Sequence, residues 1–403
     1  MTSGVPRPTR HHASRQISQR AQANPNFVNL LVGELPAGVP PVLLGALRLH
    51  AREGVAGAAH QYAPTLGVPA LRWQIAQRYA RRYGLSYQFD TEVLVTAGAT
   101  EGIWSTLLAL TEPGDEVVLF DPGYMVFASM ITALGRVPVS VDLPGVQERG
   151  LVAAVRQKMT DKTRLLILNT PENPTGRVYG WADVTALVQH CVYQGVYVMH
   201  DEVYDDFIYE GHHCTASSVT GVHELVITVN SFSKRLGVAG WRVGWLTAHH
   251  RTLERIAPYH AFAVMNCPTP LQLALAEALE DPALERHVER GRDALKRTRD
   301  QLAAALIGLH LLHPDDQPQS GFYLFLDARP LAECLGLPPN NSSTLGEQVA
   351  LHLAERAQVA VMPGVGFGAS GANHVRLAFT VDTAVLQTFL DRLRGLLQGQ
   401  HVL

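Results

Sequence analysis

The chain has 403 residues, of which 47% are hydrophobic and 17% are charged, and its formal net charge at pH 7 is −3. This length predicts one large domain with a smaller one. The near-neutral charge gives no electrostatic footprint for nucleic acid or an anionic membrane, and no apolar run has bilayer length or follows a basic start as in a secretory leader.

The N-terminal segment is locally basic, because Arg7, Arg10, Arg15 and Arg20 all precede the first acidic residue, Glu34. A basic tail can contact nucleic acid or lipid. These arginines are scattered among Pro, Ser and Thr, however, which favours a flexible arm without such a partner.

Seven short β-rich runs alternate with helical segments such as 101–109 and 181–192. The runs are 92–96, 116–120, 137–141, 164–169, 197–200, 225–230 and 241–247. This alternation predicts an α/β fold with a mostly parallel seven-stranded sheet sandwiched by helices. Ligands of such sheets bind at the carboxyl ends of the strands.

The remaining chain predicts a smaller α+β unit. A long helical pattern covers 270–307, followed by a strand at 322–326, a helix at 345–356, strands at 359–362 and 375–379, and a final helix. We expect a large domain of residues 52–290, and a small domain of residues 1–51 plus 291–403 that carries the N-terminal arm.

The cysteines indicate the redox environment. Cys191, Cys214, Cys267 and Cys334 are far apart and form no CxxC pair. We therefore expect no structural metal and no disulfide framework, as is typical of a cytoplasmic protein.

The most informative stretch, residues 231–244, reads Ser-Phe-Ser-Lys-Arg-Leu-Gly-Val-Ala-Gly-Trp-Arg-Val-Gly. Lys234 can form a Schiff base with an aldehyde if it loses its proton. Ser231, Ser233 and Arg242 are residue types that bind phosphate. The alternative for this stretch alone is a polar turn with a solvated lysine.

This stretch resembles the pyridoxal-phosphate attachment signature of the class I and II aminotransferases, which belong to the aspartate aminotransferase superfamily of fold type I. The tetrapeptides that begin at Asn173 (Asn-Pro-Thr-Gly) and Asp201 (Asp-Glu-Val-Tyr) are similar to further motifs in the family's order. The resemblance covers about residues 28–398. It implies a pyridoxal 5'-phosphate (PLP) enzyme whose cofactor is held as an aldimine on Lys234.

The resemblance also implies roles around the cofactor ring. Asn173 and Tyr204 would contact the phenolic oxygen, and Asp201 would pair with the ring nitrogen. A carboxylate there keeps the nitrogen protonated, and the protonated ring stabilises a carbanion. The alternative for Asp201 is a helix cap at a strand end. Tyr124 would stack on the ring, unless it is an ordinary core aromatic.

Phosphate and substrate contacts follow in the same way. Residues 98–101 read Gly-Ala-Thr-Glu, and the start of a helix at Ala99 with the Thr100 hydroxyl makes an anion site. Arg376 would bind the substrate carboxylate, together with Asn173 and the backbone of Gly33. Tyr62 resembles the tyrosine that reaches the phosphate of the other subunit, which implies a homodimer with a shared active site.

The implied reaction moves an amino group between an L-amino acid and a 2-oxo acid, in amino-acid metabolism or biosynthesis, with Lys234 as general base. Thr100 stands where some aspartate aminotransferases carry a lysine, so we expect neutral or basic amino acids to be preferred over aspartate. Arg235 and Leu236 follow the lysine where small or aromatic residues are common.

Two alternatives stay open. The same scaffold also supports lyases, cyclases and oxidases that act on a specialised amino acid, because a fold does not fix a reaction. A PLP-bearing transcription regulator is disfavoured, because the sequence shows no helix-turn-helix domain and no strong basic patch.

Overall fold

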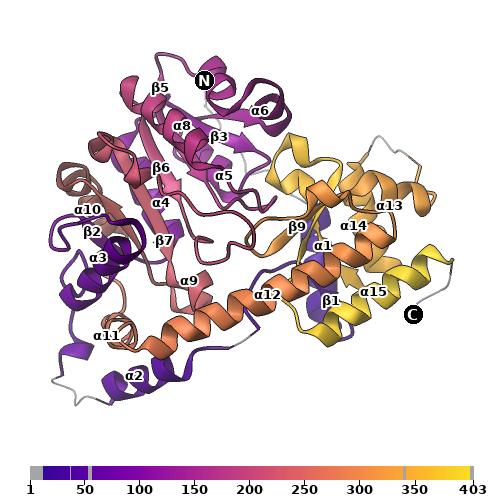
Figure 1. Ribbon diagram of the computed structural model, residues 1–403, viewed down its shortest axis with the longest axis horizontal. Helices are drawn as coiled ribbons and strands as arrows, with labels where there is room; N and C mark the ends of the chain where they lie inside the picture. The colour runs from indigo at the N-terminus through magenta and orange to yellow at the C-terminus, as the bar shows by residue number, and fades with distance from the viewer. Residues whose placement is uncertain (1–11, 37, 53–56, 339–341, 400–403) are drawn as a thin grey trace, which may run out of the picture.

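The computed structural model describes residues 12–36, 38–52, 57–338 and 342–399. A layered α/β unit and a smaller unit lie side by side, and the long helix α12 (Pro282–Gly308) runs from one to the other (Figure 1). Among the described residues, no helix combines the length and the apolar character needed to span a membrane.

The central sheet has seven strands, as the sequence predicts. All neighbours are parallel except β8, which is antiparallel to both β2 and β7. In spatial order the strands are β2 (Val93–Thr96), β8 (Gly244–Ala248), β7 (Val226–Ser231), β6 (Tyr197–Asp201), β5 (Thr163–Asn169), β3 (Glu116–Asp121) and β4 (Val137–Asp142).

One of these strands begins later than expected. Residues 239–241 form a 3-10 turn, and Arg242 has a φ of 53°, which is incompatible with an extended strand. Strand β8 therefore begins at Gly244 rather than at 241.

Alternate strand residues pack on opposite faces, which explains the apolar runs. Leu165 and Ile167 face α4 (Ala99–Leu110), α5 (Val126–Ala133) and α10 (His250–Val264). Leu166 and Leu168 face α6 (Leu143–Arg149), α7 (Leu151–Lys158) and α8 (Trp181–Tyr193). Because both faces are covered, the strands are apolar on both sides.

A third core lies beyond the β2 edge of the sheet. It is built by α2 (Pro41–Ala51), α3 (Pro69–Tyr83), α11 (Thr269–Ala278) and the one-turn helix α9 (Phe232–Arg235). The single helix expected over 270–307 is two helices, α11 and α12. The Asp281 side chain accepts a hydrogen bond from the Ala283 amide (2.8 Å), and Pro282 occupies the first turn, so a new helix begins there.

The smaller unit holds a three-stranded antiparallel sheet of β11 (Met362–Pro363), β12 (His374–Ala378) and β9 (Tyr323–Asp327). A separate parallel pair joins β1 (Val28–Asn29) to β10 (Val359–Ala360). The strand expected at 359–362 is thus two short strands with different partners. Three further helices complete the unit: α13 (Ala328–Cys334), α14 (Leu345–Arg356) and α15 (Thr383–Leu397).

The prediction of a flexible N-terminal arm is wrong for residues 12–23. They form α1 (His12–Ala23), which packs on α14 through buried Ile17, and Arg20 pairs with Glu355 at 3.0 Å. Arg7 and Arg10 lie outside the described residues. The domain boundaries at 51/52 and 290/291 stay a prediction; α2 makes its main contacts with α11.

Candidate active site

The register of the sheet brings the predicted site residues to one edge. Thr96 and Ser231 both pair with Gly244, and Asn169 pairs with Asp201. The carboxyl ends of β2, β7, β6 and β5 therefore lie together. The segments that follow these strands carry most of the polar residues expected to act.

Lys234 lies in α9, directly after β7. The Ser231 hydroxyl begins this short helix by accepting a hydrogen bond from the Ser233 amide (3.0 Å), and it donates to Ser233 Oγ (2.8 Å). The Lys234 Nζ donates to the carbonyl of Gly33 (3.0 Å) and lies 5.9 and 5.6 Å from the ring centroids of Tyr204 and Phe322. The lysine is therefore enclosed between the large sheet and the smaller unit, and is not a solvated turn residue.

Asp201 is buried, and no cation among the described residues pairs with it. It is 3% exposed, and its carboxylate accepts a hydrogen bond from the Val203 amide (3.2 Å). Burial raises the pKa of Asp201 to about 6, although the Val203 amide and the nearby His200 and Lys234 lower it. The segment after Asp201 is a turn rather than a helix, so this carboxylate is not a helix cap.

Asn169 positions the loop that carries Asn173. Its Nδ2 donates to the Asp201 carbonyl (3.1 Å), and its Oδ1 accepts from the Asn173 amide (3.1 Å). The sequence places Asn169 only at a strand end and does not reveal this supporting role.

Arg376 lies at the opposite wall of the cleft. Its Nη1 donates to Asn173 Oδ1 (3.1 Å) and its Nη2 to the Leu31 carbonyl (2.6 Å), while its buried Nε has no hydrogen-bond partner in the described chain. Its guanidinium carbon is 3.8 Å from the ring centroid of Tyr323 and 4.7 Å from that of Phe367. The site thus offers a buried cation held by aromatic rings.

Tyr323 is a site residue that the sequence reasoning missed. Burial would raise the pKa of Tyr323, but the charges of Arg376 and Lys234 outweigh it, and this pKa is lowered. A Cβ atom at Gly33 would lie 2.5 Å from the Tyr323 hydroxyl, so the close approach requires glycine. Strand alternation could have found Tyr323, because β9 pairs with the strand that carries Arg376.

The start of α4 and Arg242 form the other end of the site. A Cβ atom at Gly98 would lie 2.4 Å from Arg242 Nη2, so this glycine lets the guanidinium approach the helix start at Ala99. Arg242 donates to the Ala239 carbonyl (3.1 Å), and no carboxylate pairs with it among the residues the structure describes. A free cation beside a helix N-terminus, with the partly buried Thr100 in its first turn, can bind an anion.

The three other predicted tyrosines differ in position. Tyr204 is buried with its ring centroid 5.2 Å from that of Phe322. Burial raises the pKa of Tyr124, and the charge of Asp201 adds to this effect, which places Tyr124 near the same carboxylate. Tyr62 is 84% exposed and makes no hydrogen bond with these residues in the described part of the chain. One subunit therefore does not bring Tyr62 into its own site.

Three possible metal ligands, His200, Glu202 and His213, lie within 4.8 Å of one another on the far side of β6. Both ring nitrogens of His200 already bond the backbone, Nε2 to the Thr170 carbonyl (3.1 Å) and Nδ1 to the Ala216 amide (3.0 Å). Because that lone pair is in use, we assign no metal to this cluster.

Comparison with protein families gives one match over most of the chain. The family model for "Aminotransferase class I and II" matches residues 25–393. A "Probable aspartate/prephenate aminotransferase" of Aquifex aeolicus is 32% identical over 84% of both chains. An "Aromatic-amino-acid aminotransferase 2" of Thermococcus litoralis is 29% identical over 96% of both.

Solved structures give the same result. The aspartate aminotransferase of Thermus thermophilus with maleate superposes with a TM-score of 0.85 at 30% identity, over 95% of this chain and 96% of that one. The N-succinyldiaminopimelate aminotransferase of Mycobacterium tuberculosis gives a TM-score of 0.85 at 29% identity, over 98% and 100%.

Proposed function

Since this chain belongs to the class I and II aminotransferases, we propose that it moves the amino group of an L-amino acid with a neutral or basic side chain to a 2-oxo acid, with Lys234 as the attachment point of its cofactor. The protein is a PLP-dependent transaminase. The assignment of individual residues and of the substrate is our proposal.

The groups at the sheet edge fit PLP in charge and chemistry. Asp201 is a buried carboxylate without a cation, and Arg242 with the start of α4 offers an anion site without a carboxylate. Lys234 supplies a primary amine. A cofactor with an aldehyde, a protonated ring nitrogen and a phosphate would use these groups.

When bound, the cofactor withdraws electrons from the Cα atom of the amino acid and makes its proton acidic. Asp201 keeps the ring nitrogen protonated, because a cation beside this desolvated carboxylate favours its ionised form. The Lys234 amine takes up the Cα proton and returns it. The rings of Tyr204 and Phe322 lie beside that amine, which is partly buried.

Arg376 binds the substrate α-carboxylate in this proposal, because its buried Nε is free and Asn173 fixes its orientation. Thr100 adds no positive charge for a second carboxylate. The aromatic rings of Tyr323 and Phe367 suit neutral side chains, including aromatic ones. The relatives named for aromatic amino acids support this preference, whereas those named for aspartate support the competing one.

A homodimer with a shared site explains the position of Tyr62. Tyr62 and Phe262 are 84% and 85% exposed, and Met265 is 60% exposed. Apolar side chains this exposed favour a protein interface. We propose that a second copy covers them and that Tyr62 reaches the phosphate in its partner's site.

The observation that carries the proposal is the enclosed Lys234 amine, and the chain makes it easy to test. The only lysines are Lys158, Lys162, Lys234 and Lys296. Borohydride reduction of the yellow enzyme followed by peptide mapping should label Lys234, and Lys234→Ala should lower turnover by several orders of magnitude. A label on another lysine would refute the assignment.

A panel of amino acids tests the substrate. Neutral and basic donors should show a higher kcat/KM than aspartate, and an aspartate value above all of them would overturn this preference. Formation of the pyridoxamine form without ammonia release or oxygen uptake identifies transamination. Ammonia or oxygen chemistry would point to a lyase or an oxidase.

Mixing two inactive variants tests the shared site. Lys234→Ala and a severely impaired Tyr62 variant should regain activity in hybrid dimers, each of which holds one intact site. A fully active monomer in sedimentation would contradict the dimer.

A further inference from the structure

The residue after Lys234 is an arginine that faces away from the cleft. Arg235 is the last residue of α9 and is buried, with its Nη1 2.7 Å from the Asp206 carboxylate. Its Nη2 donates to Glu285 in the first turn of α12. One guanidinium therefore joins the lysine helix to two distant segments.

Asp206 is the fixed side of this junction. Its carboxylate also accepts from Arg78 Nη2 (2.9 Å) and pairs with Arg82, both on α3. The buried Arg78 and the partly exposed Arg82 anchor it to the large unit. Asp206 follows Tyr204 by two residues, so Arg235 ties the lysine helix to the segment that carries Asp201 and Tyr204.

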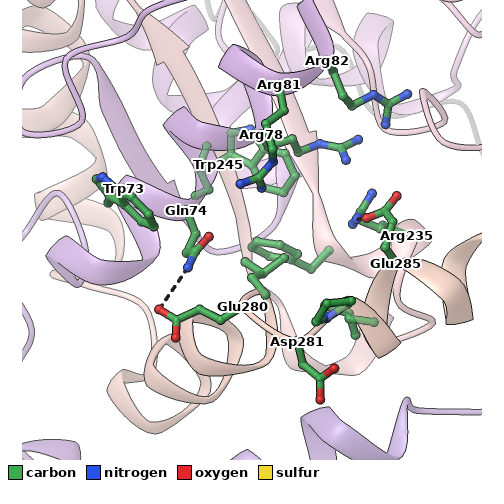
Figure 2. Close-up of a pocket in the computed structure, with 15 residues that line it drawn as sticks. Trp73, Gln74, Arg78, Arg81, Arg82, Arg235, Trp245, Glu280, Asp281 and Glu285 are labelled. Carbon is green, nitrogen blue, oxygen red and sulfur yellow. Dashed lines mark hydrogen bonds and ion pairs between the residues drawn. The ribbon is translucent and has the colours of Figure 1, made fainter.

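Glu285 is the partner of Arg235 that is free to move. Its side chain is 55% exposed, and it lies beside Arg235 at the rim of a cavity of about 620 Å³ (Figure 2). The cavity is lined by both residues, by Arg78 and Arg82, and by Phe232 and Trp245 behind the lysine segment. Because the Glu285 side chain is exposed and lies next to open space, it can move away from the buried Arg235 and return.

Helix α12 connects this junction to the smaller unit. It begins at Pro282 beside α9, packs on α15 along its length and ends at Gly308 (Figure 1). The smaller unit also holds Arg376 and Tyr323 of the site. Any shift of α12 relative to the sheet therefore acts on the Arg235–Glu285 pair.

We propose that Arg235 is a positioning residue, which holds Lys234 in register with Asp201 through Asp206 and transmits the position of α12 to the lysine through Glu285. A helix of four residues has too few internal hydrogen bonds to fix its own orientation. Its orientation must come from side-chain contacts, and the ion pairs of Arg235 supply them. This inference rests on the role proposed above for Lys234.

The test compares three variants of the full-length protein. Glu285→Gln removes the link to α12, Arg235→Lys keeps the charge but loses the two-sided contact, and Glu289→Gln removes the same charge one turn further along α12. The structure records no ion pair for Glu289, which is exposed, so it is the matched control.

The first readout uses the cofactor-free protein. An amine-selective acylating reagent is applied, and labelling of Lys234 is compared with that of exposed Lys162 in the same sample by peptide mass spectrometry. Glu285→Gln and Arg235→Lys should increase the Lys234/Lys162 ratio several-fold because α9 is loosened. Glu289→Gln should leave it unchanged.

The second readout uses the loaded enzyme. The first two variants should lower kcat several-fold with little change in KM, and should shift the pH at which the absorbance of the bound cofactor changes. If both variants lower only the melting temperature, with an unchanged labelling ratio, kcat and spectral pH profile, Arg235 is merely structural and the proposal is wrong. The labelling ratio does not depend on the assigned reaction, so a failure of the proposed function is distinguishable.

Discussion

Asp201 and Asp206 are buried carboxylates five residues apart in one segment, yet their surroundings differ completely. No cation pairs with Asp201, and burial raises its pKa to about 6. Asp206 pairs with Arg78, Arg82 and Arg235, which hold its pKa well below its usual range although burial alone would raise it.

The same difference separates the two sides of the sheet edge. On the cleft side, the buried Nε of Arg376 has no hydrogen-bond partner in the described chain. Behind it, Asp205 accepts from Arg78 (2.7 Å) and Tyr83 (3.1 Å). Unsatisfied buried groups cost folding free energy unless a ligand compensates them. The paired carboxylates Asp205 and Asp206 thus hold the scaffold, whereas the unpaired Nε of Arg376 is available to a ligand.

Removing Asp206, the carboxylate that pairs with three arginines, should have the largest effect on stability. Asp206→Asn leaves the buried Arg78 and Arg235, and the partly exposed Arg82, with fewer charges to balance them. It should lower the free energy of unfolding by about 3–5 kcal/mol. Urea denaturation of the cofactor-free protein measures it. A decrease in the free energy of unfolding below about 1 kcal/mol would show that the ion pairs of Asp206 do not hold the scaffold.

Removing the charge of Asp201, which has no paired cation in the described chain, should increase stability instead. Asp201→Asn should lower turnover by about two to four orders of magnitude, yet should stabilise the cofactor-free protein. The folded pKa is raised from 3.8 to about 6, so the stability of wild type falls as pH rises through this window and stays low above it. At pH 8 the gain is at most about 3 kcal/mol.

A cofactor-free Asp201→Asn protein that melts below wild type at pH 8 would contradict the comparison. Asp115→Asn is a suitable control for the substitution, because this carboxylate lies on the partly exposed turn before β3 and has no role in the cleft.

Glu172 is a second buried carboxylate without a paired cation in the described chain, and its removal should change stability alone. It lies in the loop that carries Asn173, and burial raises its pKa from 4.5 to about 7 although the Thr175 hydroxyl donates to it. The folded chain keeps a proton that the unfolded chain loses, so stability falls as pH rises from about 4.5 to 7.

Glu172→Gln should remove this pH dependence and raise stability at pH 8 by about 1–3 kcal/mol. Melting temperatures from pH 5 to 8 measure it, with Glu148→Gln as control, because that side chain is 72% exposed. If the melting temperatures of wild type and Glu172→Gln depend on pH in the same way, Glu172 does not cause the pH dependence.

The sequence predicted what depends on local pattern. Short β-rich runs between helical segments located all seven strands of the large sheet, and family motifs pointed to Lys234, Asp201 and Arg376, which the structure brings to the same region. Contacts between distant segments escaped it: Arg235 meets Asp206 and Glu285 at separations of 29 and 50 residues. Tyr323 escaped because alternation places it beside Arg376 only once the pairing of β9 with β12 is known. The break at Asp281 escaped because a Pro after a polar residue inside a helical pattern permits either a kink or a new helix.

The pairing of β1 with β10 has a consequence for biosynthesis of the chain. Val28 leaves the ribosome 331 residues before its partner Val359. The large sheet can assemble during synthesis, since its last strand ends at Ala248. The Gly33 carbonyl that contacts Lys234 lies just after β1. A prematurely terminated product that lacks β10 would therefore expose a folded sheet with an unfinished catalytic cleft, a species for chaperones and proteases to recognise.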